Sequence, residues 1–86
     1  MPTISAFFGI SIRMYYDDHG PSHFHAHYGS DAAKIDIETL RILAGMLPRR
    51  AMAMVLEWAS DHRDELRRNW VLAQQHRALE RIAPLE

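Results

Sequence analysis

The sequence predicts an α+β fold, in which an antiparallel sheet of about four strands is followed by one long C-terminal helix packed across it. Apolar and polar residues alternate along the first half of the chain, which is the period of a strand with one buried face. After Pro48 no glycine or proline occurs until Pro84, and apolar residues recur with the period of a helix. At 86 residues the chain is predicted to be one domain, residues 1–86.

The strand pattern can be followed element by element. Turn residues at 17–22 and 29–31 separate the alternating segments, and Gly9 supplies a bend near the start. The strands are expected at Thr3–Phe8, Ile10–Tyr16, His23–Tyr28, Ala33–Ile37 and, as a last short strand, near Arg41–Ala44. The connections are too short for parallel crossovers, so the strands should form an antiparallel meander.

The helix is expected over Pro48–Gln75, since proline suits the first helical position. One stripe about 100° wide collects the residues expected to face the sheet, which are Ala51, Val55, Ala59, His62, Leu66, Trp70 and Ala73. Because the apolar stripe keeps the same helical phase over this whole range, one helix is favoured over two, although Ser60 and Asp61 are able to cap a second helix. A single helix would overhang the sheet, so Trp58 and Trp70 are expected to contact a partner. The sequence thus predicts a homo-oligomer formed through the C-terminal helix.

The composition argues against several classes of protein. Ten basic and eleven acidic side chains give a formal charge of −1, so the whole molecule lacks the positive field of non-specific nucleic-acid binders. Contact with RNA would therefore need a local patch of positive charge. There is no cysteine, no signal-peptide pattern and no apolar run long enough to span a membrane. The expected location is cytoplasmic, with no membrane partner.

Three histidines alternate on the strand His23–Tyr28. His23, His25 and His27 share one face, whereas Phe24, Ala26 and Tyr28 form the opposite face. The apolar face should pack on the helix. The histidines are then expected on the outer face or at the edge of the sheet, with cross-strand neighbours among Arg13, Tyr15 and Lys34.

This histidine row is compatible with several chemistries. The His-x-His pattern chelates borderline metals, but it needs a further ligand from among Asp17, Asp18, His27 and His62. Alternatively, one histidine acts as an acid or base in phosphodiester chemistry while arginines hold the phosphate. The row is also compatible with a solvated strand face. The pattern resembles a nucleotide-binding histidine triad, but only 22 residues precede it, too few to build the nucleotide pocket.

Two further positions are candidates for binding. His62 occupies an apolar position in the helix stripe, either as a core-edge residue or facing the strand histidines with Glu65 orienting it. Arg49 and Arg50 oppose the macrodipole at the helix start, which suggests an anion or an acidic partner unless they are simply solvated.

Several segments together resemble a known family. They are RMYYDDH at 13–19, PSHFHA at 21–26, LPRRA at 47–51, EWA at 57–59, HRDEL at 62–66 and NW at 69–70. Over nearly the whole chain they are similar to the small bacterial family catalogued as domain of unknown function 4160. Ser22, His27 and Leu40 depart from the usual family pattern, so His27 is expected to be a solvated bystander.

The resemblance implies the toxin of a type II toxin–antitoxin pair, which impairs translation by binding ribosomal components or by cutting RNA. The implied partners are a cognate antitoxin and a ribosomal protein or RNA. As an enzyme, the protein would be a metal-independent ribonuclease without a cofactor. His23 and His25 would be catalytic, and the residues expected to bind substrate are Arg13, Arg49, Arg50 and His62. The alternative is a non-toxic metal-binding or protein-interaction module that uses the His-x-His strand.

Overall fold

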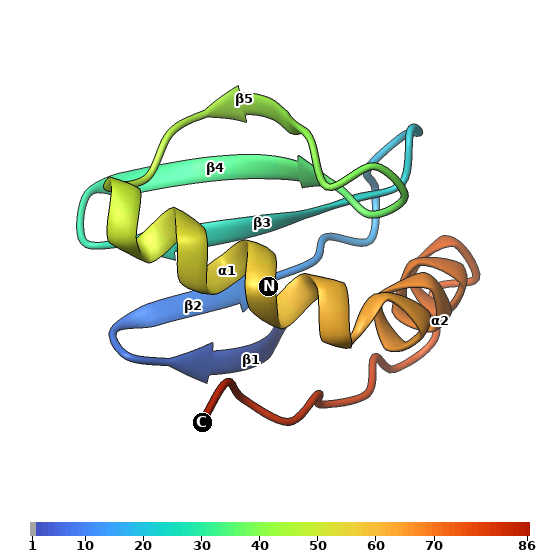
Figure 1. The fold of residues 1–86 in the computed structure, drawn as a ribbon. Coiled ribbons are helices and arrows are strands. Elements are labelled where there is room, and N and C mark those ends of the chain that lie inside the picture. Colours follow the sequence, from blue (N-terminus) through green and yellow to red (C-terminus); the bar gives the residue numbers. More distant parts are fainter. Residues whose placement is uncertain (1) are drawn as a thin grey trace.

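A computed structural model describes residues 2–86 and contains a five-stranded sheet followed by two helices (Figure 1). The strands are β1 (Thr3–Phe7), β2 (Ile10–Arg13), β3 (His23–Tyr28), β4 (Asp31–Asp36) and β5 (Ile42–Gly45), and the helices are α1 (Arg49–Asp61) and α2 (Arg63–Gln74). The strands follow one another in sheet order, and every neighbouring pair is antiparallel. The predicted α+β class and meander are confirmed. The sheet has five strands rather than about four, because both outer segments pair with their neighbours.

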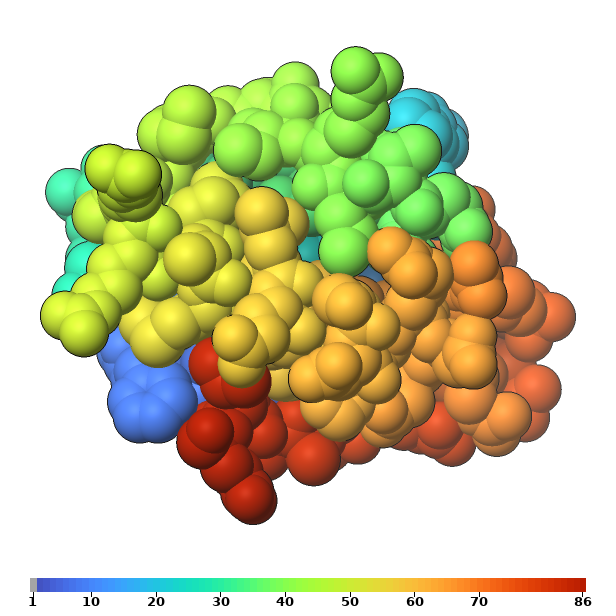
Figure 2. Space-filling view, viewed as in Figure 1, coloured from blue at the N-terminus to red at the C-terminus, as the bar shows by residue number. Residues whose placement is uncertain are grey.

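The core lies between α1 and one face of the sheet. Phe24 and Ile12 from the sheet are fully buried together with Val55 and Trp58 from α1, and the Trp58 ring makes an edge contact with Phe24. Burying one such large apolar side chain contributes roughly 1.5–3 kcal/mol. Figure 2 shows this face covered by the helices and by the C-terminal segment. The predicted packing of the apolar face of this strand is therefore confirmed for Phe24 and Ala26, whereas Tyr28 is exposed.

The prediction of one long helix is wrong, because the backbone leaves the helical conformation at His62 (φ −123°, ψ 24°). Asp64 and Glu65 lie in the first turn of α2, where the positive end of a helix dipole favours them, so the sequence supports a new helix start here. The apolar stripe continues through the break, since Leu66 and Ala73 are buried. The break turns α2 past the end of the sheet at which β3 begins (Figure 1). The expected overhang is replaced by packing against that end.

The C-terminal segment after α2 runs back to the sheet. The amide of Ile82 donates to the carbonyl oxygen of Ile4 in β1 at 2.8 Å, and the indole Nε1 of Trp58 donates to the carbonyl oxygen of Ala83 at 2.8 Å. Trp58 also packs against Phe7. Its exposed fraction is 0%, so the expectation that Trp58 contacts a second copy or another partner is wrong.

Neither helix described within residues 2–86 combines the length and apolar character that a membrane crossing requires.

Candidate functional site at the start of β3

The pairing of β3 with its neighbours places two cations beside its histidines. His25 lies directly opposite Arg13 of β2 and Lys34 of β4. Directly opposed residues in a sheet point to the same face, so Arg13, His25 and Lys34 form a row across three strands. We call these three residues the cross-strand row. This placement confirms Arg13 and Lys34 as neighbours of the histidines.

His23 is buried, with an exposed fraction of 1%, and so it departs from the expected outer or edge position. The indole of Trp70 in α2 lies over it, with 5.1 Å between the ring centroids. This contact follows from the break at His62, which directs α2 to the end of the sheet where β3 starts.

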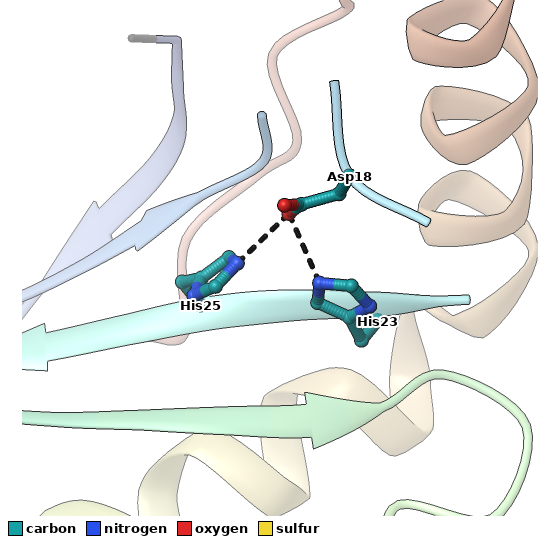
Figure 3. A group of neighbouring side chains, drawn as sticks. All are labelled: Asp18, His23 and His25. Atoms are coloured by element: carbon teal, nitrogen blue, oxygen red, sulfur yellow. Dashed lines mark hydrogen bonds and ion pairs between the residues drawn. The ribbon is translucent and has the colours of Figure 1, made fainter. Parts of the chain in front are cut away.

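One carboxylate contacts both His23 and His25. Asp18 lies in the loop between β2 and β3, and its Oδ2 is 3.0 Å from the Nε2 of His23 and 3.0 Å from the Nε2 of His25 (Figure 3). The amide Nε2 of Gln74 donates to the main-chain carbonyl oxygen of Asp18 at 3.1 Å, which links the loop to α2. We call Asp18, His23 and His25 the Asp18 cluster.

The second ring nitrogen of His23 fixes the position of a proton. Nδ1 lies 2.8 Å from the carbonyl oxygen of Pro21, and a carbonyl oxygen only accepts hydrogen bonds, so Nδ1 must donate. A neutral His23 would then direct the lone pair of Nε2 at the oxygen of Asp18. Two facing lone pairs repel, so the contact requires a proton or a metal ion between them.

The electrostatics of the cluster favour an ionised Asp18. Partial burial raises the pKa of this carboxyl, but its hydrogen bonds with the rings of His25 and His23 lower the pKa by more. The net result is a pKa below the ordinary value for aspartate.

His25 forms the accessible side of the cluster. Its side chain is 22% exposed, and its ring makes an edge contact with Tyr15 at 4.5 Å between centroids. An open groove of about 420 Å³ begins here and is lined also by Lys34, His27 and Gly45. Asp18 and Tyr15 line a second hollow of about 340 Å³. Ligands can therefore reach the cluster from solvent.

His27 lies outside the cluster, with its Nε2 3.4 Å from the hydroxyl oxygen of Tyr15. Burial and the positive charge of Arg13 lower its pKa below the ordinary value. The neutral ring is thus favoured at neutral pH.

The remaining predicted site residues are not brought to the cluster. Arg49 and Arg50 open α1, which packs on the Phe24 face, whereas His25 points to the opposite face. His62 hydrogen-bonds Glu65 and packs beside Trp58, so the predicted pairing with Glu65 is confirmed. Binding roles for Arg49, Arg50 and His62 stay predictions.

The sequence offers Asp18 only as one of four possible additional ligands, and it gives no sign that Trp70 covers His23. Asp18 comes five residues before His23, so a short returning loop is enough to bring the two together. The position of Trp70 depends on the helix break, for which the sequence signal was the acidic pair Asp64 and Glu65.

Comparison with known families gives one match, to the family model described as "Domain of unknown function (DUF4160)", over residues 9–71. The matched region includes β2, β3, β4, β5 and α1, and it contains both the Asp18 cluster and the cross-strand row. No curated protein and no solved structure matches the chain.

Proposed function

Since this chain belongs to the DUF4160 family, we propose that it is the toxin of a type II toxin–antitoxin pair, which is what the resemblance of its motifs implies. In this proposal it impairs translation by acting on RNA. The RNA chemistry in this proposal is argued from the residues around His25. The observation that carries it is the cross-strand row beside the Asp18 cluster.

The row has the chemistry of a phosphate contact. Arg13 and Lys34 flank His25 from the two neighbouring strands, and directly opposed side chains in a sheet lie about 5 Å apart at Cβ. Arginine and lysine are common ligands of nucleic-acid phosphates. The chain as a whole carries a formal charge of −1, so a local row of this kind is the means by which it could bind RNA.

The Asp18 cluster shares His25 with this row and would supply the catalytic centre beside the phosphate contact. A carboxylate shared by two imidazoles either moves a proton or holds a metal ion, and both chemistries suit phosphodiester cleavage. His25 is accessible and so would contact the substrate. His23 is buried and would act by positioning Asp18.

The antitoxin is proposed to bind along β5, the edge strand beyond β4. Ile42, Leu43 and Met46 are exposed on and next to this strand. An exposed apolar edge strand recruits a further strand from a partner. At the opposite edge, main-chain and side-chain hydrogen bonds from the C-terminal segment already reach β1.

Self-association through the C-terminal helix is also proposed, with Val71 in place of Trp58 as a contact residue. Trp58 is buried, whereas Val71 in α2 is 52% exposed. Sedimentation of the wild type and of Val71→Asp tests this. A monomeric wild type at high protein concentration would contradict self-association.

The toxin proposal is tested by induced expression in a bacterial host, with growth and incorporation of labelled amino acids as readouts. We expect the wild type to stop both, and His25→Ala or Arg13→Ala to relieve the block. His27→Ala is the matched control, because it removes a neighbouring imidazole outside the cluster. Circular dichroism checks that the variants fold. Unaffected growth with the wild type, or full toxicity of folded His25→Ala, would contradict the proposal.

A non-toxic interaction module is the second candidate, and the exposed β5 edge favours it. It predicts that the wild type leaves growth unaffected while a partner protein co-purifies with it. Loss of that partner in Leu43→Lys would then assign the interaction to β5.

A further inference from the structure

The Asp18 cluster has the spacing of a metal site. One ligand atom from each residue, Asp18 Oδ2, His23 Nε2 and His25 Nε2, lies within 4.8 Å of the other two. Transition metals bind imidazole nitrogen and carboxylate oxygen at about 2.0–2.2 Å, which sets neighbouring ligand atoms on the order of 3 Å apart. The oxygen of Asp18 is 3.0 Å from each nitrogen.

The orientation of His23 matches that of a metal ligand. Its Nδ1 donates to the carbonyl oxygen of Pro21, so Nε2 presents its lone pair to the cluster. Histidines that ligate metals usually hold their other nitrogen in this way, on a backbone carbonyl or a carboxylate. The ring is also fixed by Trp70 and is 1% exposed, so it cannot turn away without disturbing the core.

One carboxylate oxygen, Asp18 Oδ2, lies 3.0 Å from the Nε2 atoms of both histidines. A single divalent cation neutralises the carboxylate and satisfies both nitrogen lone pairs at once.

We propose that Asp18, His23 and His25 bind one divalent transition-metal ion through Oδ2, Nε2 and Nε2. Two imidazoles suit zinc, iron, nickel or copper better than magnesium or calcium. Three protein ligands leave at least one coordination position for water or a substrate oxygen. The two hollows, lined by His25 and by Asp18, give the ion and the substrate access.

This inference builds on the proposed function, because it assigns a cofactor to the same reacting centre. It also replaces the sequence-based expectation of a metal-independent site. Metal binding is measured on the purified protein and toxicity in cells. Either can therefore fail while the other stands.

The test uses the full chain stripped of metal and titrated with Zn²⁺ alone by isothermal titration calorimetry. We expect one equivalent to bind, with Asp18→Asn and His25→Ala each weakening the affinity by more than about tenfold. His27→Ala and His62→Ala should bind as the wild type does, since neither residue belongs to the cluster. Both ligand variants alter partly exposed side chains and should fold.

Nuclear magnetic resonance of the wild type gives a readout that needs no variant. Zn²⁺ should shift the Nε2 resonances of His23 and His25 and leave the proton on Nδ1 of His23 in place. Binding of less than about half an equivalent would overturn the proposal. Unshifted Nε2 resonances, or unchanged affinity in folded His25→Ala, would overturn it as well.

Discussion

The side-chain amide of Asn69 makes both of its hydrogen bonds to the main chain of Glu80. Nδ2 donates to the carbonyl oxygen at 2.8 Å, and Oδ1 accepts from the amide at 2.8 Å. Asn69 is 1% exposed, so water does not replace either bond. This pair attaches the C-terminal segment to α2.

Asn69→Ala should therefore destabilise the fold. Losing two buried hydrogen bonds should cost about 2 kcal/mol, or a Tm lowered by roughly 10 °C in a domain of this size. Arg68→Ala is the matched control and should change Tm little, because among residues 2–86 its guanidinium bonds the exposed carboxylate of Glu80 alone. Equal melting of the two variants would show that Asn69 does not hold the segment.

Gly45 should tolerate no side chain. Its φ is +75°, and an added Cβ would lie 2.2 Å from the carbonyl oxygen of Ala32. Gly45→Ala should lower the free energy of unfolding by more than about 3 kcal/mol, which combines backbone strain with displacement of β5 from β4. Gly29→Ala is the control for strain alone, because its φ is +59° but the space around it is open. That variant should lose about 1 kcal/mol. Chemical denaturation measures both, and similar losses would contradict the steric argument.

Ser5→Ala should stabilise the protein. Ser5 is 1% exposed, and its hydroxyl has no hydrogen-bond partner among residues 2–86. Removing a buried hydroxyl that lacks a partner should raise the free energy of unfolding by about 1 kcal/mol. Ser11→Ala serves as the comparison, since the Ser11 hydroxyl accepts from Arg13 and should not gain stability when removed. A lower Tm for Ser5→Ala would indicate that water satisfies the hydroxyl.

The ion pair between Glu38 and Arg67 should stabilise the fold only above acidic pH. The guanidinium of Arg67 donates to both carboxylate oxygens of Glu38 and lowers the pKa of Glu38 below its ordinary value of 4.5. A group with a lower pKa in the folded state stabilises above its unfolded pKa, and this contribution is lost as pH falls through the folded pKa.

Thermal melts of Glu38→Gln and wild type should therefore differ at pH 7 and converge as pH falls below the lowered pKa of folded Glu38. The difference at pH 7 should be small, because both side chains are about half exposed. A Tm difference that persists unchanged in acid would assign the effect to something other than the ion pair.

Local patterns predicted the strands better than the helices. The boundaries of His23–Tyr28 agree with β3 to the residue, because turn chemistry ends the alternation on both sides. The expected strand Ile10–Tyr16 was too long, since β2 ends at Arg13 and the chain then leaves the sheet. Alternation continues in the sequence, but strand pairing depends on where the partner strand begins.

The helix break shows what periodicity cannot reveal. An apolar stripe in one phase is compatible with a single helix and also with two helices that turn around a sheet. The positions of Trp58 and Trp70, and with them the position of His23, depend on whether the segment forms one helix or two. The Asp18 cluster depends on loop geometry and on α2 together. The sequence could therefore name its members but could not select them from the alternatives.

The two tryptophans occupy different surroundings, one inside the core against Phe24 and the other against His23. Indole emission responds to polarity and to contact quenching, so each residue is an intrinsic optical probe of its own region. Trp58 should report whether the polypeptide is folded. Trp70 should report the state of the imidazole beside it, whether neutral, protonated or bound to an ion. A change at the cluster would thus be visible as a change in fluorescence, without any attached label.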